Sequence, residues 1–227
     1  DLLAAWWDEQ SPEQLQAVSD AALQMGADTA FSASDAAGAM LELAKSGFTV
    51  EQSMIATRAA LDLAAVGAMS VTDAAGAVST AMSVFGLEAS DAASIADSFA
   101  RAAMASRAEV PDLVDALENA GPVARQFGLD LNETNAALAV FADNGLIGAE
   151  AGTQLRSMLL NMNSDAARDA FTELGVSLYD ATGNIRDFDT VLDELDAALD
   201  QLPVEDQNRL MQELAGAYGI TGLSALR

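Results

Sequence analysis

The sequence has 227 residues, 51% of them hydrophobic and 20% charged, so it holds enough apolar material for a sizeable core in one large helical domain or two smaller ones. Its 35 acidic and 10 basic residues give a formal net charge of −25, which argues against binding to nucleic-acid phosphates and against adsorption on anionic membranes. It contains no cysteine and no histidine, which excludes disulfides, thiolate nucleophiles, histidine general bases and the usual kinds of zinc site.

The composition predicts helices along the whole chain. Alanine is the best helix former and makes up about a fifth of the residues, whereas aromatic residues are 5% and prolines number four. We therefore predict an all-α fold: a compact multi-helix bundle of about ten short capped helices, with one small β-hairpin at 176–188.

The chain starts at Asp1 without a methionine, and we interpret it as a fragment of something longer. Residues 1–26, which include Trp6 and Trp7, are expected to form a lead-in helix at the edge of that fragment. Residues 27–175 are the predicted main helical core. Residues 176–227 are predicted to contribute the β-hairpin and C-terminal helices that pack on this core.

The helix boundaries follow one recurring sequence motif, in which a glycine and a bulky apolar residue precede the next helix. Gly47-Phe48 and Gly128-Leu129 are examples; the glycine takes the left-handed conformation that ends a helix, and the apolar residue packs back on the last turn. Thr49 and Gln52 then have the spacing of an N-terminal capping box. Between such signals the predicted helices lie near residues 12–25, 34–46, 50–65, 71–84, 90–104, 109–127, 131–143, 149–162, 165–174, 189–201 and 204–215.

Two neighbouring helices are predicted to be the buried centre. In helix 50–65 the charged residues Glu51, Arg58 and Asp62 occupy one narrow stripe, and helix 71–84 has no charge after Asp73. Neighbours are therefore expected to pack on both sides of these two helices.

Helix 109–127 contains Gly121-Pro122, where proline removes an amide donor and clashes with the preceding turn. Apolar residues nevertheless keep helical spacing across this point, from Leu113 to Phe127. We therefore predict a kinked helix or two end-stacked helices rather than a loop.

Residues 176–188 break the helical pattern, because two alternating runs flank Asp180-Ala-Thr-Gly-Asn184, as in a short β-hairpin. With Asp187 and Asp189 this segment also suggests an oxygen-ligand calcium loop. Its spacing does not match the twelve-residue helix–loop–helix pattern, and the closing glutamate is missing. Turn chemistry explains these residue types equally well, and we favour it.

Paired carboxylates such as Asp193 with Asp196 or Asp200 have the chemistry for acid–base hydrolysis, including that of glycosides. In so acidic a chain such pairs arise by chance, and we favour a solvated helix face. We predict no catalytic, cofactor-binding or metal-binding residue.

Methionines at helical spacing are interpreted mainly as core residues that fill gaps among alanines, rather than as an adaptable partner surface. They are Met40, Met54, Met69, Met82, Met104, Met158 and Met162. Arg125 and Arg156 are scarce cations in an acidic chain and are candidates for inter-helix ion pairs, either internal or between copies.

Several blocks, in this order, resemble the core region of phage tail tape measure proteins. They are ADTAFSASDAAGAMLELAKSGF (27–48), LDLAAVGAMSVTDAAGAVSTAMSVFGLEASDAASIADSFARAAMAS (61–106), LENAGPVARQFGLDLNETNAALAVFADNGLIGAEAGTQLRSMLL (117–160) and LGVSLYDATGNIRDFDTVLDELDAAL (174–199). The segment GAEAGTQLRSMLL (148–160) and the order of the blocks are the most specific features. The near absence of lysine and the many aspartates depart mildly from the family's pattern.

This resemblance implies a structural role in the virion tail, in tail assembly, length determination and genome ejection, with no enzymatic activity and no cofactor. The implied partners are tail tube and tail tip proteins, tail assembly chaperones and other copies of the chain, and the implied location is the virion tail, with the host cytoplasm during assembly. The competing interpretations are a generic helical interaction or scaffold module and, less favoured, a cell-wall hydrolase segment.

A measuring rod needs length, and an extended helix of this size would span roughly 340 Å at about 1.5 Å per residue. Capped turns every dozen or two residues predict a compact segment instead. We therefore expect this to be the folded part of a tape measure and not the rod.

Overall fold

The structure is a computed structural model that describes residues 11–226; Trp6, Trp7 and the rest of the first ten residues of the predicted lead-in segment lie outside that range. The described residues form eleven α-helices and one short 3-10 helix, without strands, which confirms the predicted all-α fold. The elements are α2 (Pro12–Asp28), α3 (Ala33–Lys45), α4 (Val50–Gly67), α5 (Val71–Phe85), η1 (Ala89–Asp91), α6 (Ala92–Ala105), α7 (Val110–Gln126), α8 (Leu131–Asp143), α9 (Gly148–Asn161), α10 (Asp165–Leu174), α11 (Phe188–Leu199) and α12 (Val204–Leu226).

The helices begin where the sequence places caps. Thr49 accepts a hydrogen bond from the backbone N–H of Gln52, and the Gln52 side chain accepts one from the backbone N–H of Thr49, which completes a capping box. Ser32 and Asp35 do the same at the start of α3. Each reciprocal pair satisfies two backbone donors that a helix start otherwise leaves unpaired.

The helix ends confirm that glycines end the helices in the left-handed conformation. Gly47 and Gly128 have φ angles of +92° and +84°, in the left-handed region that favours glycine. The next residue's N–H then donates back across the last turn, from Phe48 to the Leu43 carbonyl (3.2 Å) and from Leu129 to the Ala124 carbonyl (3.0 Å). The chain turns tightly at each junction and starts the next helix within a few residues.

The chain divides into two compact units, Asp1–Arg101 and Ala102–Arg227, and the division falls inside α6. The predicted domain boundaries at 26/27 and 175/176 stay predictions.

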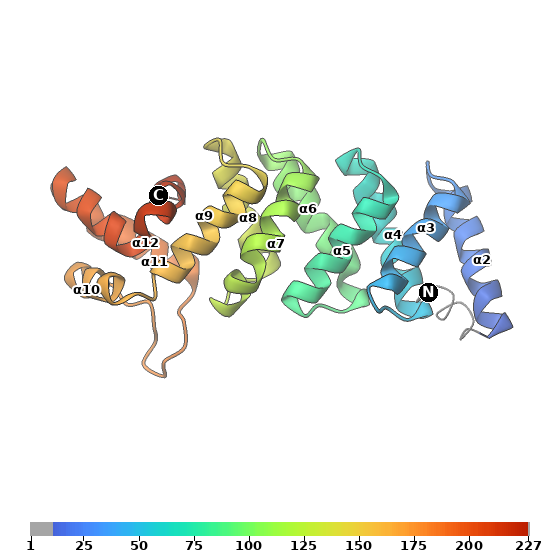
Figure 1. Cartoon of the computed structure of the whole chain (residues 1–227), viewed down its shortest axis with the longest axis horizontal. Helices are drawn as coiled ribbons and strands as arrows, with labels where there is room; N and C mark the ends of the chain where they lie inside the picture. Colours follow the sequence, from blue (N-terminus) through green and yellow to red (C-terminus); the bar gives the residue numbers. More distant parts are fainter. Residues whose placement is uncertain (1–10, 227) are drawn as a thin grey trace. The chain divides into compact units, whose positions relative to one another are not determined.

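In the first unit α3 packs on α2, α4 and α5, and α4 also packs on α5 (Figure 1). Helices α4 and α5 bury nine and eight side chains, respectively, in agreement with their predicted place at the buried centre. Among the described residues no single helix is long and apolar enough to cross a membrane; only α4 and α5 taken together meet that criterion, and they are bent by 116° at their junction.

In the second unit α9 lies between α7 and α12, and both pack closely on it (Figure 1). Helix α7 is one helix from Val110 to Gln126 with Pro122 inside it, so a helix rather than a loop spans this region, as predicted. The predicted kink at Pro122 stays a prediction. Leu113, Leu117, Ala120 and Ala124 are buried on one side of this helix. The close approach of α7 depends on Gly152 in α9, where an added Cβ would lie 2.3 Å from the Ala116 carbonyl oxygen.

Helix α12 breaks directly after the predicted end at 215 and continues in a second helical part to Leu226, which the sequence did not predict. Its course is interrupted at Gly216, where φ is 68° and ψ is 174°, a conformation essentially restricted to glycine. The second part of α12 carries Gly219 and Gly222, and both face neighbours that leave no room for a Cβ. The glycines give the second part of α12 a low helix propensity, so the sequence did not predict this helix, which packing stabilises.

The middle of the segment 176–188 extends away from the helices of this unit (Figure 1), whereas Val176, Leu178 and Phe188 are buried. The predicted hairpin is reduced to one antiparallel bridge between Tyr179 and Ile185, closed by the Asp180 N–H donating to the Asn184 carbonyl (2.8 Å). The turn was predictable from its residues, but two paired residues are too few to form strands.

Candidate interaction site

The carboxylate of Asp180 accepts hydrogen bonds from within its own loop. Oδ1 of Asp180 accepts from the Thr182 hydroxyl (2.7 Å), the Thr182 N–H (2.8 Å) and the Asn184 N–H (2.9 Å). These bonds, above all that from the Thr182 hydroxyl, lower the pKa of Asp180 from its usual value. The loop is thus an aspartate-stabilised turn, which is the explanation favoured from the sequence.

Asp187 and Asp189, the other acids of the suggested calcium loop, have different positions. Asp187 caps α11 by accepting from the Thr190 hydroxyl (2.5 Å) and N–H (2.8 Å), and these bonds lower the pKa of Asp187. Asp189 is exposed in the first turn of α11. Over residues 11–226 no three acidic side chains converge on one point in a way that would hold a metal ion.

The hairpin segment is held to the helices by two side chains. The Arg186 guanidinium donates to both carboxylate oxygens of Glu194 on α11, at 2.6 and 2.8 Å, and the Tyr179 hydroxyl bonds to the Asn163 side chain. The hydrogen bonds from Arg186 lower the pKa of Glu194. The sequence did not single out these four residues, because their pairing depends on how α11 returns past the hairpin.

The carboxylates of α11 face different surroundings. Asp193 and Asp200 are exposed, as expected for a solvated face, whereas Asp196 is half-buried. Neither exposed acid sits in the enclosed apolar pocket that a carboxylic acid needs to act as a proton donor near neutral pH.

Most of the methionines that were interpreted as core are buried. Met40, Met82, Met158 and Met162 are each at most 2% exposed, and Met54 and Met69 are half-buried. The prediction is wrong for Met104, which is 80% exposed. It follows Ala103 and lies off the buried face of α6, which Ala92, Ile95, Ala96 and Phe99 form.

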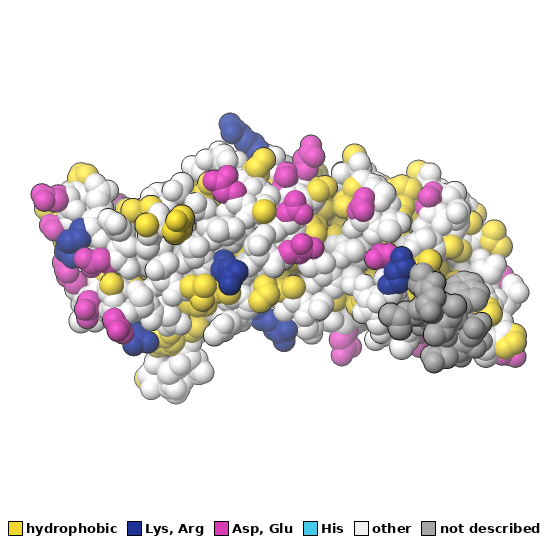
Figure 2. Space-filling view, in the orientation of Figure 1, with side chains coloured by type: hydrophobic (Ala, Val, Ile, Leu, Met, Phe, Trp, Pro, Cys, Tyr) yellow, Lys and Arg dark blue, Asp and Glu magenta, His cyan; other side chains and the backbone are white. Residues whose placement is uncertain are grey.

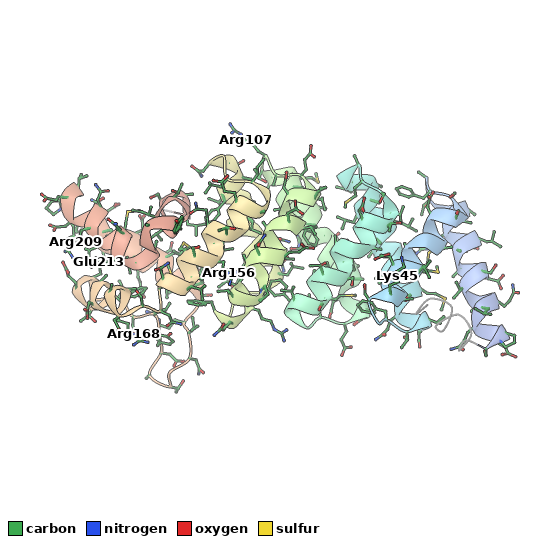
Figure 3. The ribbon with its side chains drawn as sticks, viewed as in Figure 1. Lys45, Arg107, Arg156, Arg168, Arg209 and Glu213 are labelled. Atoms are coloured by element: carbon green, nitrogen blue, oxygen red, sulfur yellow. The ribbon has the colours of Figure 1, made fainter. Side chains whose placement is uncertain are left out.

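Two inter-helix ion pairs involve arginines that the sequence did not single out for this role. Arg209 of α12 bonds Glu173 of α10 at 2.5 Å and also reaches Glu213 (Figure 3), and these bonds raise the pKa of Arg209. Arg58 of α4 lies 3.6 Å from Asp28 of α2. Arg156 projects from the exposed side of α9 (Figure 3) and forms no ion pair within residues 11–226, so a pair between copies stays a prediction.

The second unit has a groove of about 390 Å³ lined mainly by α8 and α11, which we call the α8–α11 groove. Its apolar lining includes Ala136 and Val140 of α8, Leu192 of α11 and Leu226 at the end of α12. Val140 is 38% exposed, and Leu192 and Leu226 are half-buried. Apolar surface is therefore open to solvent in a concave place, where binding sites usually lie.

Among the described residues, the charged side chains that line the groove are acidic: Glu133 of α8, and Asp189 and Asp193 of α11. Asp189 and Asp193 are one helical turn apart, next to the apolar line of Phe188 and Leu192. On the face seen in Figure 2, acidic side chains outnumber the basic ones that lie among them. An apolar floor with acidic edges favours binding of a cationic, partly apolar surface.

Comparison with known proteins gives three matches. Residues 19–216 match the model of a family described as phage-related minor tail protein. The chain is 40% identical over 216 residues to the "Tape measure protein" of Pneumococcus phage Dp-1, an alignment that covers 94% of this chain and 19% of that protein. It is 31% identical over 217 residues to the "Probable tape measure protein" of Escherichia phage P2, covering 94% of this chain and 27% of the relative. No solved structure matches the chain.

Proposed function

The chain belongs to the phage-related minor tail protein family, and we propose that it is the folded core segment of a tape measure protein, acting in tail assembly, in length determination and in genome ejection. The alignment of nearly the whole chain with two tape measure proteins is the observation that carries this proposal. It agrees with the resemblance seen in the sequence. The chain spans only about a fifth to a quarter of the length of these relatives, so the role of the whole protein is part of the proposal.

The local structure supports a folded segment rather than a stretched one. Every junction from α3 to α5 combines a helix stop with a side-chain cap within a few residues, as at Gly47 and Thr49. If the same residues formed one extended helix, they would lose these caps and the buried core between the helices. We propose that the segment keeps its fold while it acts, and that other parts of the parent protein provide length.

As partners we propose tail tube and tail tip proteins, tail assembly chaperones and other copies of the chain, in the virion tail and, during assembly, in the host cytoplasm. We propose that the segment is not an enzyme. In support, Asp189 and Asp193 are exposed, Asp187 caps α11, and Glu194 forms an ion pair with Arg186. A peptidoglycan zymogram of the purified chain tests this point, and a cleared band would contradict it.

The tail location is tested with virions of the parent phage. Tails separated from capsids are digested and analysed by mass spectrometry for peptides from residues 27–226. We expect these peptides in the tail fraction and not in the capsid fraction. Their recovery only from the non-virion part of the lysate would contradict the proposal.

A further inference from the structure

The α8–α11 groove has the chemistry of a docking site for one kind of partner. We propose that it binds a cationic amphipathic helix of another protein, whose apolar side chains contact Val140 and Leu192 and whose lysine or arginine side chains pair with Glu133, Asp189 and Asp193. This inference names a partner chemistry beyond the proposed tail role and does not depend on that role.

The floor of the groove fits the apolar face of a helix. Ala136 and Val140 are one turn apart on α8, and Leu192 faces them from α11, so apolar contacts recur along the groove at helical spacing. Alanine and valine are short side chains and leave depth for larger ones. Recognition by helix-in-groove docking uses apolar anchors at such spacing.

The edges of the groove favour a positively charged partner. Within residues 11–226, Asp189 and Asp193 have no ion-pair partner, and no cation lines the groove. Glu133 accepts a hydrogen bond from the Asp130 N–H at 2.6 Å, and its carboxylate has further acceptor capacity. The three carboxylates do not form a metal-binding group within residues 11–226, so separate positive charges along a partner match them better than one ion.

The same charges disfavour the other occupants. A second copy would bring a chain of formal charge −25 against an acidic groove, and like charges brought together at an interface are costly. Nucleic-acid phosphates and anionic lipid headgroups are repelled for the same reason. A protein helix with basic flanks is attracted by the edges and buries apolar surface on the floor.

The test uses the 227-residue chain and two model peptides. One is an 18-residue helix built of leucine and lysine so that the leucines lie on one face; the other has glutamate in place of each lysine. Binding is measured by fluorescence anisotropy at physiological salt, and methyl NMR follows the signals of Val140, Leu192 and Leu226. We expect the lysine peptide to bind and to shift these three methyl signals, and the glutamate peptide not to bind.

Two pairs of variants separate the groove from the general negative charge. Asp189→Asn with Asp193→Arg alters the edge; Asp115→Asn with Glu118→Arg makes the same change of charge at two exposed positions of α7. Val140→Ser alters the floor; Leu160→Ser is its control, since Leu160 is 48% exposed on α9. We expect roughly tenfold weaker binding for each groove variant, and less than about twofold for each control.

Equal losses in groove and control variants would overturn the proposal, since binding would then follow net charge alone. Equal affinity for the glutamate peptide would overturn it as well. Sedimentation of the free chain adds a third outcome. A dimer that Val140→Ser converts to a monomer would identify a second copy as the occupant and would overturn the cationic-helix proposal.

Discussion

Gly219 of α12 lies directly against Met158 of α9, so that a Cβ built at Gly219 would come within 2.6 Å of the Met158 Cα and 2.8 Å of its backbone nitrogen. On its other side α9 packs against α7, and Gly152 leaves the room for this contact. The segment 148–160, whose sequence is the most specific part of the family resemblance, is thus the helix on which the second unit is built. Gly152 of α9 and Gly219 of α12 set how closely the neighbouring helices approach it.

The close contact at Gly219 predicts that Gly219→Ala destabilises the chain, although alanine is the better helix former. The added methyl group meets backbone atoms that cannot move aside, so we expect a loss of about 1–3 kcal/mol in the free energy of unfolding. Gly76→Ala in α5 is the control, because no atom lies within 4 Å of a Cβ there. It should stabilise by about 0.5–1 kcal/mol. Urea denaturation of both variants gives the comparison, and a stabilising Gly219→Ala would refute the packing of α12 on α9.

The residues after the helix-ending glycines differ in burial, which predicts an order of effects. Leu129 is 3% exposed, whereas Phe48 and Leu87 are half-buried. Leu129→Ala should cost about 2–4 kcal/mol in the free energy of unfolding, and Phe48→Ala and Leu87→Ala should cost less. Chemical denaturation measures all three. Losses below about 0.5 kcal/mol at every position would show that these residues do not pack back on their helices.

The Asp180 turn predicts a local dependence on pH. Because hydrogen bonds lower the pKa of the folded Asp180, its contribution to stability is present above the unfolded pKa, near 3.8, and is lost as the pH falls through the folded value. Thr182→Val removes the hydroxyl donor and should raise the pKa of Asp180 toward the ordinary value. Carboxyl NMR titration measures the pKa directly. The pKa of Asp187, which depends on Thr190, is the internal control and should not move.

The net charge of −25 predicts self-repulsion in the folded chain, which salt should screen. The melting temperature should therefore rise between low and molar sodium chloride at pH 7. The rise should be smaller near pH 4, where many carboxylates are protonated. A melting temperature that stays flat or falls with added salt at pH 7 would remove the self-repulsion argument.

The sequence was sufficient to predict most helices because their ends depend on neighbours in the chain. Glycine at positive φ and a Ser, Thr or Asp cap act within about four residues, so the boundaries of α8 and α10 were predicted to the residue. Residues 217–226 could not be predicted in this way. Their helix contains Gly219 and Gly222 and is stabilised by Met158 and Phe141, which belong to other helices.

The α8–α11 groove was not predicted either. Its floor combines Val140 with Leu192 and Leu226, and nothing in the local sequence around any one of them indicates the other two. The sequence suggests Asp189 only as part of a calcium loop and Asp193 only as part of a carboxylate pair. The structure places both on one edge of the groove because they are one turn apart on α11.

The central claim is that this segment acts as a folded module and adds little to the length of the parent ruler. An in-frame deletion of residues 27–226 in the parent phage, with tail lengths measured by electron microscopy, tests it most directly. The account predicts failed assembly or infection, or tails of nearly normal length. Viable phage whose tails are shorter by about 300 Å, the span of these residues as a continuous helix at about 1.5 Å per residue, would contradict it.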